Sequence, residues 1–326
     1  MLRLGIIGTG TISHEFIKAA QLSGEYEFTT VYSRTLSAAE RFAQAYKNVA
    51  LYTDMIEFLS ADLDMVYIAS PNSLHFNHAK VAILARKHVI VEKPAVSRPE
   101  EWQELVKLAA EHQVYIFEAA RNYHEAAFAV IQDFLKDKKI WGANFTYAKY
   151  SSKMEALLSG QEPNVFSAKF SGGALMDLGV YTLYAAVRLF GAPQNTRYTA
   201  QQLPNGVDLN GSGSLIYPDF QVRIQAGKNI HSQLPAEIYT DQGTLTLDGI
   251  EFIRSAIFQK LNGEMESLAI LQAEHQMLEE AQAFARVLKG GQEELYSDYL
   301  QAAATVHECL FAMRKDAGIR FEVDHD

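Results

Sequence analysis

The stretch LRLGIIGTGTIS, residues 2–13, places a short apolar strand directly before a glycine-rich loop and the start of a helix. Gly8 permits a tight turn, and Gly10 lets the backbone approach a pyrophosphate. The helix expected from Thr11 offers free N–H groups and the positive end of its dipole. A plain strand-to-helix turn is the alternative, but this order of elements is what dinucleotide binding requires. We therefore predict a nucleotide site at Gly8, Thr9, Gly10, Thr11 and Ile12, with Ser13 in place of a third glycine.

Apolar runs and amphipathic stretches alternate through the rest of the first third of the chain. We expect strands at residues 2–8, 27–33, 64–69, 88–92 and 114–117, and helices from residue 11 and at 37–46, 74–85 and 99–112. Near-continuous apolar strands with helices between them are typical of a parallel sheet covered on both faces. The sequence thus predicts a doubly wound α/β Rossmann sheet.

The pattern changes after about residue 134, where strand-like runs follow one another with turn signals between them. Expected strands lie at 144–150, 197–202, 208–217, 220–227, 237–240 and 244–247, with one helix at 174–190. Alternation within these strands predicts an open, mostly antiparallel sheet with one polar face. Helices at 273–288 and 297–316 and a strand at 320–323 are expected to close the chain. We predict an α/β domain over 1–120 and an α+β domain over 121–326.

Composition excludes several classes of protein. The chain has 326 residues, a net charge of −10 and 48% hydrophobic residues, and this acidic balance opposes binding to nucleic acid or an anionic membrane. A single cysteine rules out an intrachain disulfide. We see no signal peptide and no apolar run of the ~18–20 residues that a membrane span needs, so we expect a cytoplasmic protein. His75 and His78 lack further ligands at recognisable spacing, and no metal is predicted.

The residues after the second expected strand bear on the choice of cofactor. An enzyme that uses NAD usually places a carboxylate there, to bind the ribose hydroxyls. No acidic residue lies between Glu27 and Glu40, and Ser33 and Arg34 stand at the strand end instead. A hydroxyl and a guanidinium suit a 2′-phosphate, although a solvated arginine in a loop is a common alternative. We predict that NADP(H) is preferred, with NAD(H) as the alternative.

Two further motifs carry side chains suited to proton transfer. Lys93 follows the fourth expected parallel strand in the sequence VEKP, and ligands of open α/β sheets sit at such carboxyl ends. A lysine there can give a proton to a substrate oxygen as hydride moves. In GGALMDLGVY, residues 172–181, a helix would place Asp177 and Tyr181 on one face. A surface lysine, a helix-face charge and a core aromatic are the alternatives.

With these motifs in order, the chain resembles the Gfo/Idh/MocA oxidoreductases over essentially its whole length. The resemblance rests on GTGTIS at 8–13, SPNSLHFNHA at 70–79, KHVIVEKP at 87–94 and GGALMDLGVY at 172–181. It implies that the second domain binds substrate and forms a homodimer or homotetramer through its sheet. Lys93 would be the catalytic lysine, with Tyr181 the second acid/base candidate and Asp177 beside it. The cofactor would lie along Ser70, Pro71, Asn72, His75, Glu92 and Lys93.

Further candidates for substrate contact come from position in the chain. Arg121, Asn122 and His124 follow the last expected parallel strand, and Lys169 precedes the double glycine, although a solvent-facing lysine is the commoner case. Together these features predict an NADP(H)-dependent oxidoreductase that moves a hydride between nicotinamide and a hydroxyl or carbonyl group. The small-molecule substrate would be a sugar, polyol or diol. The alternative is a cofactor-binding sensor or regulator without chemistry, which need not keep Lys93, Asp177 and Tyr181.

Overall fold

The computed structural model describes residues 1–325, which form two compact units. Unit 1 contains Met1–Ala119 together with His275–Gln301, and unit 2 contains Ala120–Glu274 and the segment from Ala302 onward. The segment His275–Gln301 therefore packs with the first third of the chain, although the sequence pattern places it in the second domain. Each unit is described by itself below.

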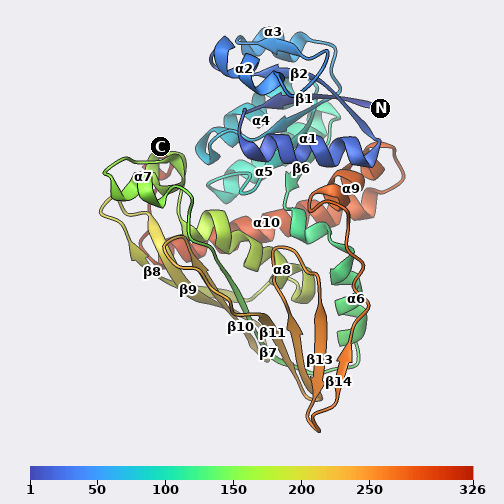
Figure 1. Cartoon of the computed structure of the whole chain (residues 1–326), viewed down its shortest axis with the longest axis vertical. Coiled ribbons are helices and arrows are strands. Elements are labelled where there is room, and N and C mark those ends of the chain that lie inside the picture. Colours follow the sequence, from blue (N-terminus) through green and yellow to red (C-terminus); the bar gives the residue numbers. More distant parts are fainter. Residues whose placement is uncertain (326) are drawn as a thin grey trace. The chain divides into compact units, whose positions relative to one another are not determined.

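Unit 1 is built on a six-stranded parallel sheet, which confirms the predicted Rossmann fold class (Figure 1). The strand order is β3-β2-β1-β4-β5-β6. The strands are β1 (Leu2–Ile7), β2 (Tyr26–Tyr32), β3 (Ala50–Tyr52), β4 (Met65–Ile68), β5 (His88–Glu92) and β6 (Ile116–Ala119). Because β1 lies at the centre, the glycine loop that follows it stands at the point where the strand order reverses, which is where ligands bind in such sheets.

Helices cover both faces of this sheet, as its largely apolar strands require. They are α1 (Thr11–Ser23), α2 (Leu36–Ala43), α3 (Met55–Ser60), α4 (His75–Leu84), α5 (Pro99–His112) and α9 (Leu278–Leu288). On one face Ile6 packs in a cluster with Phe16 of α1 and Phe284 of α9. On the other face a side chain at Gly5 would come within 2.8 Å of the Phe58 ring. That close approach explains a glycine inside a central strand.

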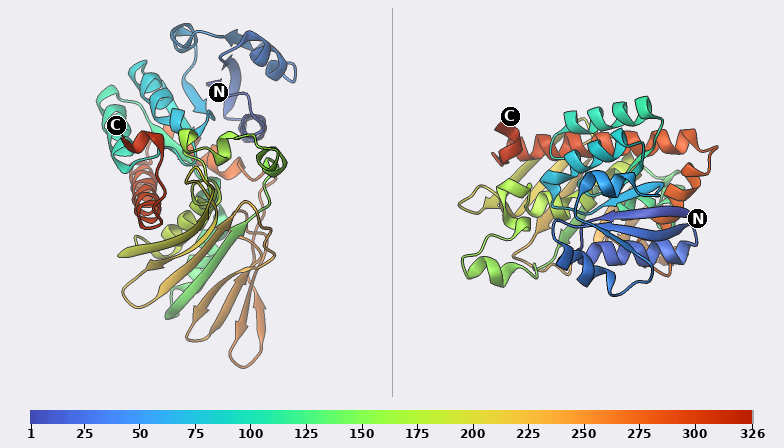
Figure 2. Two further views of the ribbon diagram at one scale, coloured as in Figure 1. Left: turned by 90° about the vertical axis from the view of Figure 1, so that its left-hand side faces the viewer. Right: turned by 90° about the horizontal axis from the view of Figure 1, so that it is seen from above.

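Unit 2 contains an eight-stranded sheet in the order β14-β13-β12-β11-β7-β10-β9-β8, which Figure 2 shows from two further directions. The strands are β7 (Ile140–Ala148), β8 (Asn195–Gln202), β9 (Asp208–Ile216), β10 (Gln221–Gly227), β11 (Ala236–Thr240), β12 (Gly243–Leu247), β13 (Ala256–Lys260) and β14 (Met265–Ser267). Every pair is antiparallel except β7 with β10. The prediction of an open, mostly antiparallel sheet is therefore confirmed.

The helices of unit 2 are α6 (Ala126–Leu135), α7 (Met154–Leu158), α8 (Val180–Phe190) and the end of α10 (Glu293–Asp316), which begins in unit 1. α8 packs against β7, β10 and α6. Contrary to the expectation about apolar runs, the helical stretch Ala168–Phe190 is long and apolar enough to cross a membrane. Burial inside unit 2 accounts for this, because 72% of its most apolar window is covered by protein.

One element at the end of the chain was predicted wrongly. Residues 320–323 were expected to form a strand, but Glu322–His325 forms a 3₁₀ helix. The Phe321 N–H donates to Asp324 Oδ2 at 2.8 Å, and the buried Arg314 guanidinium pairs with the same carboxylate. A side chain thus supplies the acceptor that a neighbouring strand would have offered, and the backbone turns. The elements β3, α3, α6, β13 and β14 were not anticipated at all.

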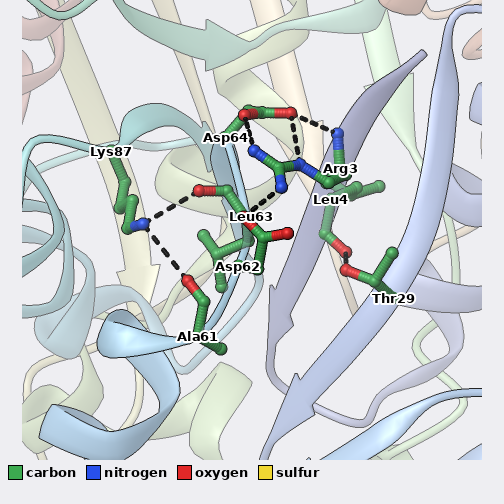
Figure 3. Close-up of polar contacts among 8 residues, drawn as sticks. All are labelled: Arg3, Leu4, Thr29, Ala61, Asp62, Leu63, Asp64 and Lys87. Atoms are coloured by element: carbon green, nitrogen blue, oxygen red, sulfur yellow. Dashed lines mark hydrogen bonds and ion pairs between the residues drawn. The ribbon is translucent and has the colours of Figure 1, made fainter.

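A polar network closes the amino ends of the parallel strands, opposite the glycine loop (Figure 3). The Arg3 guanidinium binds Asp64 through Nε at 3.0 Å and through Nη2 at 2.6 Å, and it also contacts Asp62. The Arg3 N–H donates to Asp64 Oδ2 at 2.8 Å, and Lys87 Nζ donates to the carbonyl oxygens of Ala61 and Leu63. These bonds join β1, β4 and β5 at the edge that carries no predicted site residue.

The network predicts how stability depends on pH. The Arg3 guanidinium lowers the pKa of Asp64 below its ordinary value, so the carboxylate stabilises the fold above about pH 4 and the contribution fades as pH falls. We expect Asp64→Asn to lower the free energy of unfolding by about 1 kcal/mol at pH 7, since solvent screens this partly exposed pair. Urea unfolding of both proteins at pH 7 and pH 3 measures this difference, which should shrink at pH 3.

Asp62→Asn is the matched control, because the Asp62 side chain is 85% exposed whereas that of Asp64 is 31% exposed. The control should change stability by a few tenths of a kcal/mol at most. A difference between wild type and Asp64→Asn that is as large at pH 3 as at pH 7 would contradict this account.

Candidate functional site

The loop after β1 has the geometry of a phosphate cradle. Gly8 has φ +108°, and a Cβ there would lie 2.4 Å from the Ala69 carbonyl oxygen, so only glycine fits. A Cβ at Gly10 would meet no atom within 4 Å, which leaves open space above the loop. α1 begins at Thr11 with no acidic residue in its first turn and no side chain capping its N–H groups. The tight turn, the open space and the uncapped N–H groups of α1 all suit a pyrophosphate.

Ser13, which stands where the third glycine was expected, has a defined structural role. Its side chain is fully buried, and its Oγ donates a hydrogen bond of 2.8 Å to the Gly8 carbonyl oxygen. The hydroxyl thus ties the first turn of α1 to the start of the loop. A third glycine would only leave room for the loop, whereas Ser13 also forms a hydrogen bond with it.

The ends of β2 and β4 bring basic and hydroxyl side chains to the same edge of the sheet. Ser33 and Arg34 follow β2, and Arg34 is exposed. His78 of α4 has its Nδ1 2.9 Å from Ser70 Oγ, just after β4. Burial, with smaller effects from His75 and Arg34, lowers the pKa of His78 to about 4. His78 is therefore neutral at pH 7. The sequence analysis considered His78 only as a metal ligand and did not name it among the cofactor residues.

His75 connects two of the loops that were predicted to contact the cofactor. It is fully buried at the start of α4, with Nε2 2.7 Å from the Ser70 carbonyl oxygen and Nδ1 2.9 Å from the Pro94 carbonyl oxygen. Burial lowers the pKa of His75, and a neutral ring has one N–H to donate to either carbonyl. Pro71 and Asn72 lie between Ser70 and His75 in the chain, at the start of the 3₁₀ helix η1 (Asn72–Leu74).

Lys93 directly follows β5, at the same edge of the sheet as the glycine loop. Two buried carboxylates make hydrogen bonds close to it in the chain. Glu92 accepts a hydrogen bond from the Tyr67 hydroxyl, and Glu118 of β6 accepts one of 3.1 Å from the Ala95 N–H. The backbone around Lys93 is therefore fastened to β4 and β6. This suits a side chain that must hold one position.

In unit 2 the double glycine of the second motif is required by close packing. A Cβ at Gly172 would lie 2.7 Å from the Val165 carbonyl, and one at Gly173, where φ is +124°, would lie 2.1 Å from Asp208 Oδ1. Asp208 is buried, and its Oδ2 accepts hydrogen bonds from the Leu175 N–H at 2.8 Å and the Tyr198 hydroxyl at 3.0 Å. The carboxylate of β9 thus caps the helix that carries the other motif residues.

That helix is not a regular α-helix throughout. Its first part is a π-helix, η5 (Leu175–Gly179), which contains Asp177, and Tyr181 lies in α8. π-helical turns occur frequently at functional sites. Asp177 Oδ2 contacts the ammonium of Lys228, which follows β10. The Tyr181 hydroxyl accepts a hydrogen bond of 3.3 Å from Arg121 Nε, and the Arg121 guanidinium lies 5.1 Å from the Tyr181 ring centre.

The remaining predicted residues occupy different surroundings. Asn122 is fully buried. Its amide donates to the carbonyl oxygens of Tyr181, in α8, and Ile250 at 3.0 and 3.1 Å, and the first of these bonds stabilises the position of α8. His124 is half-buried with its ring 5.5 Å from that of Tyr123. Lys169 is exposed, and its Nζ lies 5.7 Å from the Phe170 ring centre. Of this group, Arg121 shares an environment with Tyr181.

Unit 1 therefore defines a dinucleotide-binding Rossmann domain, with the glycine loop, Arg34 and Lys93 on the carboxyl edge of its sheet. Family models match both parts of the chain: "Oxidoreductase family, NAD-binding Rossmann fold" over residues 2–120, and "GFO/IDH/MocA C-terminal domain" over residues 139–246. Within residues 1–325, no group of three or more His, Cys, Asp or Glu side chains is placed to hold a metal ion.

Relatives and solved structures agree with these matches. The chain is 35% identical to the uncharacterized oxidoreductase YgjR of Escherichia coli and 32% identical to the NADP⁺-dependent scyllo-inositol 2-dehydrogenase IolU of Bacillus subtilis, over 99% of each chain. The fold matches the 3-ketoreductase KijD10 of Actinomadura kijaniata, solved with NADP and TDP-benzene, with a TM-score of 0.83 at 22% identity over 97% of this chain and 98% of that one. The chain belongs to the Gfo/Idh/MocA family of NAD(P)-dependent oxidoreductases.

Proposed function

We propose that this protein is an NADP(H)-dependent dehydrogenase that acts on a hydroxyl or carbonyl group of a sugar, polyol or diol. One observation carries the proposal: the glycine loop, Arg34 and Lys93 follow β1, β2 and β5, so they share the carboxyl edge of one parallel sheet. Such a reaction needs three features at one edge: a phosphate cradle, a cation suited to a 2′-phosphate and an ionisable amine. The similarity to an NADP⁺-dependent inositol dehydrogenase supports the same substrate class.

Each residue has a task in this proposal. Gly8, Thr9, Gly10, Thr11 and Ile12 hold the pyrophosphate, Ser33 and Arg34 hold the 2′-phosphate, and the segment from Ser70 to His75, with Glu92, borders the nicotinamide half. The bound cofactor supplies the hydride acceptor or donor. Lys93, or Tyr181, takes the hydroxyl proton as the alcohol is oxidised and returns it in reduction. Asp177 orients the substrate, and Arg121 holds the Tyr181 phenol through its hydroxyl.

Arg34 provides a test of cofactor choice. We expect Arg34→Ala to weaken NADPH binding by about 10–100-fold and NADH binding by less than about twofold, because a charge-assisted contact to the 2′-phosphate is lost. Fluorescence titration of the purified protein with each cofactor gives the four dissociation constants. Arg41→Ala, an exposed arginine of α2, is the matched control and should change neither. An equal loss for both cofactors would contradict the assignment of Arg34.

The function itself is tested by following nicotinamide absorbance with NADP⁺ and a panel of inositols, sugars and diols, and with NADPH and the corresponding ketones. Turnover of a cyclic polyol or a sugar is the expected result. Tight NADPH binding without turnover in either direction would overturn the proposal and favour a cofactor-binding sensor. The proposal also places the protein in the cytoplasm as a homodimer or homotetramer formed through the sheet of unit 2.

A further inference from the structure

Lys228 is a buried lysine that no motif in the sequence marked. It directly follows β10, and 4% of it is exposed. Its backbone is fastened on both sides: the N–H donates to the Leu209 carbonyl oxygen at 2.7 Å, and its carbonyl oxygen accepts from the Ser151 N–H at 2.8 Å. The lysine stem therefore leaves a rigid part of the sheet. Burial of the side chain restricts the movement of its ammonium group.

The ammonium meets Asp177 of the predicted site. Nζ contacts Asp177 Oδ2 and lies 5.7 Å from the centre of the Phe166 ring. The Lys228 side chain is 5% exposed, whereas that of Asp177 is 32% exposed. A buried ammonium requires a counter-charge, and here the counter-charge is a carboxylate that reaches the surface of unit 2. In this ion pair Lys228 is buried and Asp177 is partly exposed to solvent.

We propose that Lys228 is a positioning residue that holds the Asp177 carboxylate in one orientation, so that Asp177 binds a hydroxyl group of the substrate. The inference rests on the proposed function. A carboxylate offers about four acceptor positions over its two oxygens, and contact with the ammonium through Oδ2 restricts how the carboxylate plane is turned. The substrate class that this arrangement selects is a hydroxyl donor, such as a polyol, rather than an anionic or purely apolar compound.

Loss of the Lys228 ammonium is expected to affect the carboxylate of Asp177 without unfolding the helix that carries it. Asp177 lies in the π-helical segment η5, whose end is already fixed by the buried Asp208 cap. Because Asp177 is partly exposed, its carboxylate stays in contact with solvent when Lys228 is lost, and the helix can stay in place. Replacement by methionine keeps the length and apolar stem of the lysine. Lys228→Met is therefore expected to fold and to lose orientation of the carboxylate.

The experiment compares Lys228→Met, Lys228→Arg, Asp177→Asn and the double variant Lys228→Met/Asp177→Asn with the wild type, using NADP⁺ and the best polyol of the panel. We expect Lys228→Met to lower kcat/KM by about 10–100-fold, mainly through KM, as the loss of one charge-assisted hydrogen bond implies. Lys228→Arg should recover most of this loss. The double variant should be no worse than Asp177→Asn, because both changes remove one interaction.

Lys136→Met is the matched control, since Lys136 pairs with Asp133 at 2.6 Å on the surface, with both side chains at least 70% exposed. It should leave KM and kcat within about twofold of wild type. NADPH affinity should be unchanged in every variant, because unit 1 holds the cofactor residues.

Three results would overturn the inference while the proposed function stands. The first is a wild-type KM in Lys228→Met. The second is a loss of kcat/KM in the double variant that equals the product of the losses in the two single variants. The third is an equal loss of kcat in Lys228→Met and Lys228→Arg without a change in KM. Absence of turnover in the wild type itself would instead overturn the proposed function, and the role of Lys228 with it.

Discussion

Lys93→Met is expected to lower kcat by about 100-fold or more while the dissociation constant for NADPH stays within about threefold of wild type. The reason is chemical: Lys93 is proposed to exchange a proton with the substrate oxygen, and methionine has a similar length but no ionisable group. Because Glu92 and Glu118 fasten the backbone on both sides of position 93, the substitution should leave the loop in place. Steady-state turnover and fluorescence titration with NADPH, on one preparation, measure both quantities.

Lys87→Met is the matched control for this prediction. Lys87 precedes β5 and Lys93 follows it, so the two lysines stand at opposite ends of one strand. Lys87 Nζ donates to the carbonyl oxygens of Ala61 and Leu63, in the network that Figure 3 shows. Its replacement should lower stability and leave kcat unchanged. Wild-type turnover in Lys93→Met would remove Lys93 from the chemistry and leave Tyr181 as the acid/base candidate.

Gly173→Ala is expected to destabilise unit 2 strongly. We expect the free energy of unfolding to fall by about 3–5 kcal/mol, because two costs combine. An alanine at φ +124° is strained, and its Cβ would lie 2.1 Å from Oδ1 of the buried Asp208. The carboxylate would have to move, and the Leu175 N–H and the Tyr198 hydroxyl would lose their acceptor.

Gly206→Ala separates these two costs. Gly206 has φ +83°, but a Cβ there would meet no atom within 4 Å. Its substitution should cost about 1 kcal/mol, from backbone strain alone. Urea denaturation followed by circular dichroism compares the two variants. If Gly173→Ala were as stable as Gly206→Ala, the close packing of Asp208 against the double glycine would not constrain the fold.

The sequence predicted the regular part of the fold well, because periodicity and glycine placement are local properties. The parallel sheet, the helix starting at Thr11 and the mostly antiparallel second sheet all follow from short-range patterns. Short elements such as β3, β14 and α3 were missed, since each has six residues or fewer and its pattern is too brief to recognise. The strand expected at 320–323 failed because one carboxylate, Asp324, redirected the backbone.

Long-range packing produced the larger departures. The segment 275–301 follows the antiparallel sheet in sequence, yet it belongs to unit 1, where α9 buries Phe284 and Ala281 in the core of the parallel sheet. An amphipathic helix shows which of its faces is apolar, but not which sheet will cover that face. The same limit applies to Asn122, a candidate for substrate contact, whose amide proves to be bonded to two backbone carbonyls.

By itself the sequence determined the fold class, the glycine loop and the position of Lys93, because these depend on residue type and on the order of neighbouring elements. The tertiary structure alone decided which groups surround them. Lys228 meets Asp177, 51 residues away, and Asp208 caps the helix from 33 residues away. Such pairs are formed by strands that the chain brings together only on folding. Their geometry depends on buried contacts that have no counterpart in local sequence.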